Sequence, residues 1–250
     1  MSRLSFAKSI MPLKNLFRLP FPAIRSMENL QYHPYQPFIP KDAKVLLLGS
    51  APPYRFCTGI ANDLKNKDMD YYYGSYSNLL WDILFQALNP EKINCLAQFR
   101  SLEGSRKSKT AAQVQFLQFF LAENFLGLAD ILMQFTRKDT GAEDFKLTVL
   151  KYQDILGILS ANPSLVKILC TSKNRVHYWL LDYLKQQNSI TISELKDNGK
   201  SLTLKSNPAR VIKIGILPSP SARSVMRYAN KTEFLQQVAR IYKQAIMNEE

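Results

Sequence analysis

Short apolar runs, separated by loops that contain proline, glycine or serine, predict a chain in which strands alternate with helices. Buried strands are predicted within residues 45–48, 164–172 and 209–224, and short edge strands within 190–196 and 201–206, on either side of the turn signal Asn198-Gly199. Helices are predicted over 78–88, 111–123, 127–135, 144–159 and 174–187, and from the capping-box pattern Asn230-x-x-Glu233 onward. This alternation predicts a three-layer α/β/α sandwich around a mostly parallel sheet.

Three segments combine unusual chemistry with a position next to a predicted strand or helix. "LLLGSAPP" ends the first strand, "LPSPSARS" ends the last buried strand, and "YYYGSYSNLLWDIL" leads an aromatic loop into an apolar helix. Ligands of open α/β sheets bind beyond the carboxyl ends of the parallel strands. We therefore expect the first two segments to border one site.

Length and composition favour one large domain. The 250 residues are 46% hydrophobic and show no break in composition, so we expect a single domain over residues 27–250. No apolar run approaches the roughly 20 residues of a membrane span, so we expect a soluble protein with no membrane partner. Three cysteines and two histidines give no disulfide framework and no metal-ligand cluster, so no metal and no cofactor are expected.

The first 26 residues are basic and contain no acid. We consider three interpretations: a flexible basic arm, a presequence, or an over-extended start upstream of Met27. The expected location is cytoplasmic, in a bacterium, or mitochondrial or nuclear if these residues are a presequence.

The net charge of +13 is concentrated at the two ends of the chain. Residues 199–243 carry nine Lys or Arg against Glu233 alone, whereas the middle of the chain is close to balanced. A basic surface of this kind favours a polyanionic partner, with nucleic acid the leading candidate.

Two other kinds of site find no support in the sequence. The histidines lie near no nucleophile motif, so Ser-His-Asp catalysis is not indicated, and "GSAPP" lacks the spaced glycines of a dinucleotide-binding loop.

Together and in this order, the three segments resemble the signatures of the uracil-DNA glycosylase superfamily. The nearest branch is that of the hypoxanthine-DNA glycosylases and related bacterial proteins, which reads roughly G-S-x-P-P, then Y-Y-x-x-x-x-N-x-x-W, then P-S-x-S. Two positions depart from the uracil-specific branch: Ala51 stands where that branch has a water-positioning Asp or Asn, and Leu217 where it has His or Asn.

The resemblance implies that Asn78 is the catalytic polar residue. An amide can donate to a base carbonyl and accept from a ring N–H, or it can orient a water molecule. The alternative is a purely structural role, in which Asn78 only caps the helix that follows. The resemblance also implies a base-binding role for a group of residues around the first two segments: Gly49, Ser50, Ala51, Pro52, Tyr73 as the stacking aromatic, and its neighbour Tyr72. Tyr71 is expected in the core.

The Pro-Ser loop is implied to bind DNA phosphates through hydroxyls and backbone N–H groups. The residues expected to bind DNA are Pro218, Ser219, Pro220, Ser221, Arg223 and Arg227. Arg223 is our candidate for the side chain that fills the gap left by a flipped base, with one more phosphate contact as the alternative. Asp144 matches an acidic position of the family, to which we assign no function from the sequence.

The resulting hypothesis is a monomeric, monofunctional DNA glycosylase of base-excision repair, acting on DNA that contains a deaminated base, uracil or hypoxanthine. No lysine lies within the three segments, so no Schiff base or strand nicking is expected. The alternative is a protein on the same scaffold that binds nucleic acid or a damaged base without cleaving it, which the losses at Ala51 and Leu217 favour.

Overall fold

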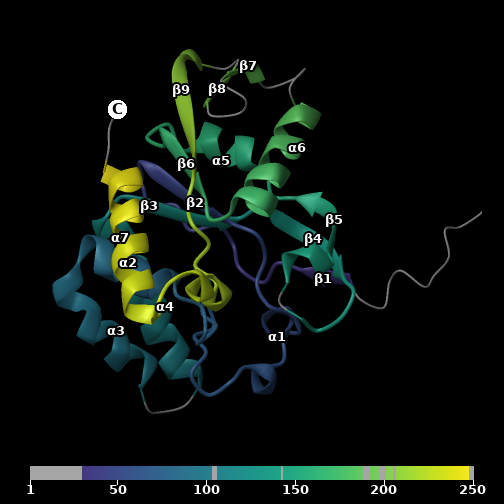
Figure 1. Cartoon of the computed structure of the whole chain (residues 1–250). Helices are drawn as coiled ribbons and strands as arrows, with labels where there is room; N and C mark the ends of the chain where they lie inside the picture. Colours follow the sequence, from purple (N-terminus) through teal and green to yellow (C-terminus); the bar gives the residue numbers. More distant parts are fainter. Residues whose placement is uncertain are drawn as a thin grey trace, which may run out of the picture.

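A computed structural model describes residues 30–102, 106–141, 143–187, 192–196, 201–204 and 207–247. The basic arm over residues 1–26 and the Asn198-Gly199 turn lie outside these ranges. The centre of the fold is a six-stranded sheet in the order β3-β2-β6-β9-β8-β7 (Figure 1). Its strands are β2 (Val45–Gly49), β3 (Leu126–Asp130), β6 (Lys167–Cys170), β7 (Ile192–Lys196), β8 (Ser201–Leu204) and β9 (Asn207–Ile216).

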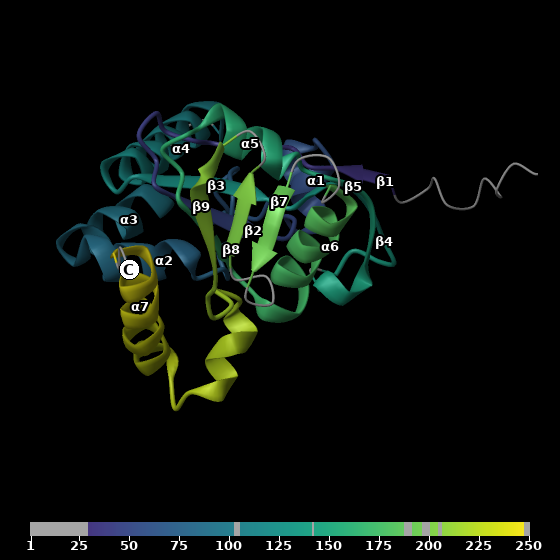
Figure 2. The same cartoon turned by 90° about the horizontal axis from the view of Figure 1, so that it is seen from above.

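The first four strands of that order are parallel, and β8 and β7 complete the sheet as an antiparallel meander. Helices lie on both faces (Figure 2), which confirms the predicted three-layer sandwich with a mostly parallel sheet. They are α1 (Tyr54–Cys57), α2 (Leu80–Leu88), α3 (Ile93–Arg100), α4 (Arg106–Glu123), α5 (Ile155–Ala161), the π-helix η5 (Lys173–His177) with α6 (Tyr178–Gln187), and α7 (Lys231–Met247).

Two apolar cores hold the layers together. Alternate side chains of β2 point to opposite faces. Val45 and Leu47 pack with α2, α4 and α7, and Leu46 and Leu48 pack with α5 and α6. Each core is filled by fully buried large side chains, among them Trp81 on the first face.

Two predicted helices are wrong. Residues 127–135 form most of β3 and β4 (Leu132–Arg137), and residues 144–159 form a 3-10 turn (Asp144–Lys146), β5 (Leu147–Tyr152) and the first part of α5. Residues 127–135 are apolar apart from Asp130 and Gln134, and such a run fits a buried helix as well as a strand buried on both faces. With β1 (Leu30–Tyr32), β4 and β5 form a second, antiparallel sheet in the order β1-β4-β5.

The last helix begins as its capping box predicts. Asn230 Oδ1 accepts from the Glu233 backbone N–H at 2.9 Å, and the Glu233 carboxylate accepts from the Ala229 N–H at 2.8 Å. Among the described residues, no helix combines the length and the apolar character that a membrane crossing needs.

Candidate active site

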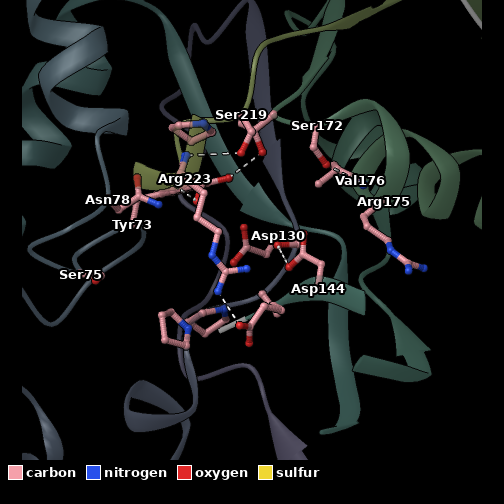
Figure 3. Close-up of a pocket in the computed structure, with 18 of the residues that line it drawn as sticks. Tyr73, Ser75, Asn78, Asp130, Asp144, Ser172, Arg175, Val176, Ser219 and Arg223 are labelled. Atoms are coloured by element: carbon pink, nitrogen blue, oxygen red, sulfur yellow. Dashed lines mark hydrogen bonds and ion pairs between the residues drawn. The ribbon is translucent and has the colours of Figure 1, made fainter. Parts of the chain in front are cut away.

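A cavity of about 460 Å³ opens at the carboxyl ends of the parallel strands. Its walls are the segments that follow β2, β6 and β9 and the last residue of β3, together with the aromatic loop before α2 and the segment before β5. Side chains at successive strand ends necessarily lie close together, because all these strands run in the same direction. The three segments of interest, far apart in the sequence, therefore meet here (Figure 3).

Nine of the predicted site residues line this cavity: Ser50, Ala51, Pro52, Tyr73, Asn78, Ser219, Pro220, Ser221 and Arg223. Four do not: Gly49, Tyr72, Pro218 and Arg227. The cavity also receives residues to which the sequence assigned no function: Asp130, Glu143, Asp144, Thr171, Ser172 and Arg175.

Asn78 both caps α2 and lines the cavity. Its Oδ1 accepts from the Leu80 backbone N–H at 2.9 Å, so the helix-cap alternative describes one half of its amide. No described residue accepts a hydrogen bond from its Nδ2. Because the cap engages the oxygen, the nitrogen is the part of the amide that has no partner among the described residues, and it offers a donor to the cavity.

Tyr73 enters the cavity wall through an unusual backbone conformation. Its φ of 53° lies in the left-handed region, which residues other than glycine rarely adopt. The Thr171 hydroxyl donates to the Leu48 carbonyl, so the Tyr73 hydroxyl donates to Thr171 Oγ1, at 2.9 Å. Burial raises the pKa of Tyr73 well above its usual value, so the phenol stays neutral.

Gly49 makes room for cavity side chains and does not itself line the cavity. A Cβ at this position would lie 2.0 Å from Asp130 Oδ1 and 2.1 Å from the Tyr73 hydroxyl oxygen. A glycine is therefore needed here because the side chains of Asp130 and Tyr73 come close to the backbone, and the predicted base-binding role of Gly49 is not the reason.

Tyr72 lies in the core, away from the cavity that it was expected to line. It is 1% exposed, its ring packs against His33 and Tyr35, and its hydroxyl donates to the Tyr35 carbonyl. A side chain buried in this way cannot stack on a base without leaving the core. Tyr71 is buried, as expected.

Asp130, the last residue of β3, is a buried carboxylate that faces the cavity. It is 7% exposed, and its Oδ2 lies 2.8 Å from His33 Nε2. His33, which the sequence gave only a structural role, also contacts the Tyr35 carbonyl through Nδ1 at 2.9 Å. The other carboxylate oxygen, Oδ1, is buried with no hydrogen-bond partner among the described residues. Such an atom is costly to leave unsatisfied.

Ser50 and Asp144 form a second polar pair in the wall. The Ser50 hydroxyl donates to Asp144 Oδ1 at 2.9 Å, and no described residue donates to Oδ2. Burial raises the pKa of Asp144 to about 6; the Ser50 hydrogen bond opposes this rise, and the nearby Asp130 carboxylate adds to it.

The Pro-Ser loop is tied to the helix that carries Asn78. The Pro220 carbonyl accepts from the Leu79 N–H at 3.0 Å, and the Pro218 carbonyl accepts from the Tyr242 hydroxyl at 2.9 Å. Leu217 is 2% exposed and packs in the core, so it offers no polar group to a ligand.

Arg223 crosses the mouth of the cavity (Figure 3) and pairs with Glu143 on the opposite rim. Lys146 holds the same carboxylate at 3.2 Å. The Arg223 side chain is 66% exposed, so this ion pair is open to solvent and easily exchanged for another anion. Arg227 is exposed on the 3-10 helix that follows, Ala222–Arg227, outside the cavity.

Three of the residues missed by sequence reasoning share one signal, which is a polar side chain at or directly after the end of a buried strand. Asp130 ends β3, and Thr171 and Ser172 follow β6. Residues 127–135 were predicted as a helix, and this hid the strand end at Asp130. Within the described ranges, no three His, Cys, Asp or Glu side chains are grouped so as to hold a metal ion.

Comparisons with known proteins add one structural likeness. No family model matches the sequence, and no curated protein matches it. Among solved structures, a solution NMR structure described as a "putative Uracil DNA glycosylase" from Methanosarcina acetivorans is similar over 85% of this chain and 98% of that chain, with 17% identity and a TM-score of 0.47. A likeness of this size says nothing about the reaction, which has to be inferred from the side chains of the cavity.

Proposed function

We propose that this protein is a DNA glycosylase that hydrolyses the N-glycosidic bond of a deaminated base, uracil or hypoxanthine, flipped out of DNA. The observation that carries the proposal is the meeting of the three sequence segments around one cavity, with Asn78, Tyr73, Ser50 and the Pro-Ser loop in its wall. A base must leave the duplex to enter such a cavity, and an aromatic wall helps to hold it there.

The chemistry of bond cleavage fits the donor that Asn78 presents. Breaking the glycosidic bond leaves negative charge on the departing base and positive charge on the sugar. A fixed N–H group directed at a base carbonyl stabilises the anion as it forms. The cap at Leu80 holds the amide in place, so the donor is oriented before the base arrives.

The Asn78 donor matches one edge of a deaminated base. Its Nδ2 has no acceptor among the described residues, so it is available to a base carbonyl. Uracil and hypoxanthine both present a ring N–H beside a C=O, whereas cytosine and adenine present a ring nitrogen acceptor beside an amino group. A donor that faces this edge would accept the C=O of the deaminated product and reject the amino group of its parent base.

The remaining features concern the DNA strand. Ser219, Ser221 and Arg223 line the cavity, and in this proposal their side chains and the backbone of the loop contact phosphates. No lysine is among the described residues that line the cavity, which supports hydrolysis by water without a Schiff-base intermediate. The product would be an abasic site in an unbroken strand.

The test is a base-release assay on end-labelled oligonucleotides that contain uracil, hypoxanthine or xanthine, single-stranded and in each pairing. Strand cleavage is scored with and without alkali. We expect alkali-dependent cleavage of at least one substrate by the wild-type protein. DNA binding with no base release from any substrate would contradict the proposal and favour the binding-protein alternative.

Two variants separate the roles of Asn78. Asn78→Asp keeps the oxygen that caps α2 and removes the donor, whereas Asn78→Ala removes both. We expect both variants to bind DNA and to lose about 10²-fold or more in release rate, with Asn78→Asp remaining as stable as the wild type. Asn89→Ala, at the opposite end of the same helix and outside the cavity, is the matched control. Unchanged release in Asn78→Asp would show that capping is the only role of this residue.

A further inference from the structure

Three carboxylates line the cavity among the described residues, and two of them are engaged. Asp130 is bound by His33 through Oδ2, and its Oδ1 is buried against Gly49. Glu143 is held by Arg223 and Lys146 at the rim. Asp144 differs from both, because Ser50 occupies one oxygen and no described residue donates to the other.

A hydrolytic water needs an acceptor for its proton. Asn78 cannot take up this proton, because an amide oxygen is too weakly basic, and this oxygen already accepts from the Leu80 N–H. Ala51, next to Ser50 in the cavity wall, has no polar side chain. The free oxygen of Asp144 is therefore the acceptor that the cavity keeps available.

We propose that Asp144 is the general base of the reaction and that Ser50 positions it. This inference rests on the proposed glycosylase function. Asp144 Oδ2 accepts a proton from water as the water oxygen bonds to the sugar carbon C1′ and the bond from C1′ to the base nitrogen breaks. The electron pair of that bond leaves with the base, whose carbonyl accepts from Asn78 Nδ2, and the base later takes a proton from solvent. The negative carboxylate also stabilises the positive charge on the sugar.

The surroundings of Asp144 suit this role near neutral pH. Its pKa of about 6 leaves it ionised at pH 7, while a base with a pKa close to the working pH transfers protons effectively. The charged groups that face it are Asp130 at the end of β3, Arg137 from β4 and Arg175 from η5, with Glu143 and Arg223 at the rim. The arginines do not titrate near this pH, so a rate change near pH 6 can be assigned by comparing variants.

The experiment measures single-turnover base release against pH on an oligonucleotide that contains the base released by the wild-type protein. Because the carboxylate is the active form, the wild-type rate should rise with pH, with a midpoint near 6, and level off above it. Asp144→Asn keeps the shape and the acceptor for Ser50, and it removes the base. We expect its rate to fall about 100-fold or more and to lose this midpoint, with DNA affinity unchanged within about threefold.

Two further variants distinguish catalysis from a structural role. Ser50→Ala removes the hydrogen bond that lowers the pKa of Asp144, so its midpoint should move to higher pH while release persists above it. Asp139→Asn removes an equivalent charge from a carboxylate that lies outside the cavity and pairs with Lys146, and it should keep the wild-type profile.

The outcomes separate the two proposals. The assignment of Asp144 as the base is supported if base release by Asp144→Asn is slow and independent of pH and if the midpoint of the Ser50→Ala profile moves to higher pH. If Asp144→Asn releases base within about threefold of the wild-type rate, or if both variants keep the wild-type midpoint, Asp144 is not the base; the glycosylase function then stands on the loss of release in Asn78→Asp. If the wild type releases no base from any substrate, both proposals fall.

Discussion

At the scale of single residues, the site depends on side chains in which one polar atom makes an internal hydrogen bond and the other has no partner among the described residues. Asn78 uses its oxygen to cap α2 and keeps its nitrogen for the cavity. Asp130 uses one oxygen to bind His33 and leaves the other unpartnered, and Asp144 binds Ser50 in the same manner. In each case an internal hydrogen bond fixes the side chain, so that the remaining atom points in a defined direction. Such preorganisation is what a reactive site requires.

Gly49 is the residue whose substitution should damage this arrangement most directly. In Gly49→Ala the new Cβ would lie 2.0 Å from Asp130 Oδ1, so Asp130 and Tyr73 have to move. We expect a loss of about 1–3 kcal/mol in the free energy of unfolding, measured by urea denaturation, together with a loss of base release. Gly215→Ala is the control, because its Cβ would meet only the end of the Leu169 side chain. An equal effect in the two variants would contradict the role given to Gly49.

At the scale of elements, one buried carboxylate organises the aromatic loop before α2. Asp68 accepts from the Arg55 side chain at 2.6 Å and from the backbone N–H groups of Lys65 and Tyr76. Arg55 also donates to Ser75 at 2.8 Å. These contacts join α1, which follows β2, to the loop that carries Tyr73 and Asn78, so one ion pair holds two walls of the cavity together.

Asp68→Asn should therefore loosen this loop. Burial alone would raise the pKa of Asp68, but the hydrogen bonds from Arg55 and the backbone outweigh it and hold the pKa below its usual value. The stabilisation is present above the unfolded pKa of about 4 and is lost as pH falls through the folded pKa. We expect Asp68→Asn to cost about 2–3 kcal/mol at neutral pH, and less at about pH 3.

Urea denaturation of wild type, Asp68→Asn and Asp63→Asn at both pH values measures this difference. Asp63 is exposed on a nearby 3-10 turn, so its substitution should change little. A cost for Asp68→Asn that is the same at both pH values would show that the charge of Asp68 is not the cause.

The elements also show where the sequence pattern fails. The strands over residues 45–48 and within 164–172 and 209–224 were predictable, because short apolar runs that end in polar turn residues have few other interpretations. The strands within residues 127–135 were not predictable. There the chain passes from one sheet to the other, and its apolar run has neither the period of a helix nor the period of a half-buried strand. That error hid Asp130, which reaches the cavity only as the end of a strand.

At the scale of the whole molecule, the basic charge should govern the encounter with DNA. The net charge is +13, and Arg223, Arg227 and Lys231 follow the last strand on the side where the cavity opens. Each phosphate that such residues neutralise releases counterions, which makes binding depend on salt.

We expect DNA affinity to fall about 10- to 1,000-fold between roughly 50 and 200 mM salt, as measured by fluorescence anisotropy. Arg227→Gln should weaken binding similarly for all sequences and reduce the salt slope by about 1. Lys41→Gln, in an exposed turn at the opposite ends of the strands, should leave both unchanged. The same salt slope in Arg227→Gln as in wild type would place the DNA contact elsewhere.

The sequence by itself determined the sandwich, the mostly parallel sheet and the segments that line the cavity, because apolar runs, turn residues and caps act over a few neighbouring positions. It did not determine which polar atoms remain free. His33 and Asp130 are 97 residues apart and Ser50 and Asp144 are 94 apart. Asp130 and Ser50 lie at the ends of parallel strands, whereas His33 follows β1 and Asp144 precedes β5, so each pair meets within 3 Å only where the antiparallel sheet packs against these strand ends. The tertiary structure therefore decided that Tyr72 belongs to the core and that two acids join Asn78, since burial and hydrogen bonding depend on neighbours that are distant in the chain.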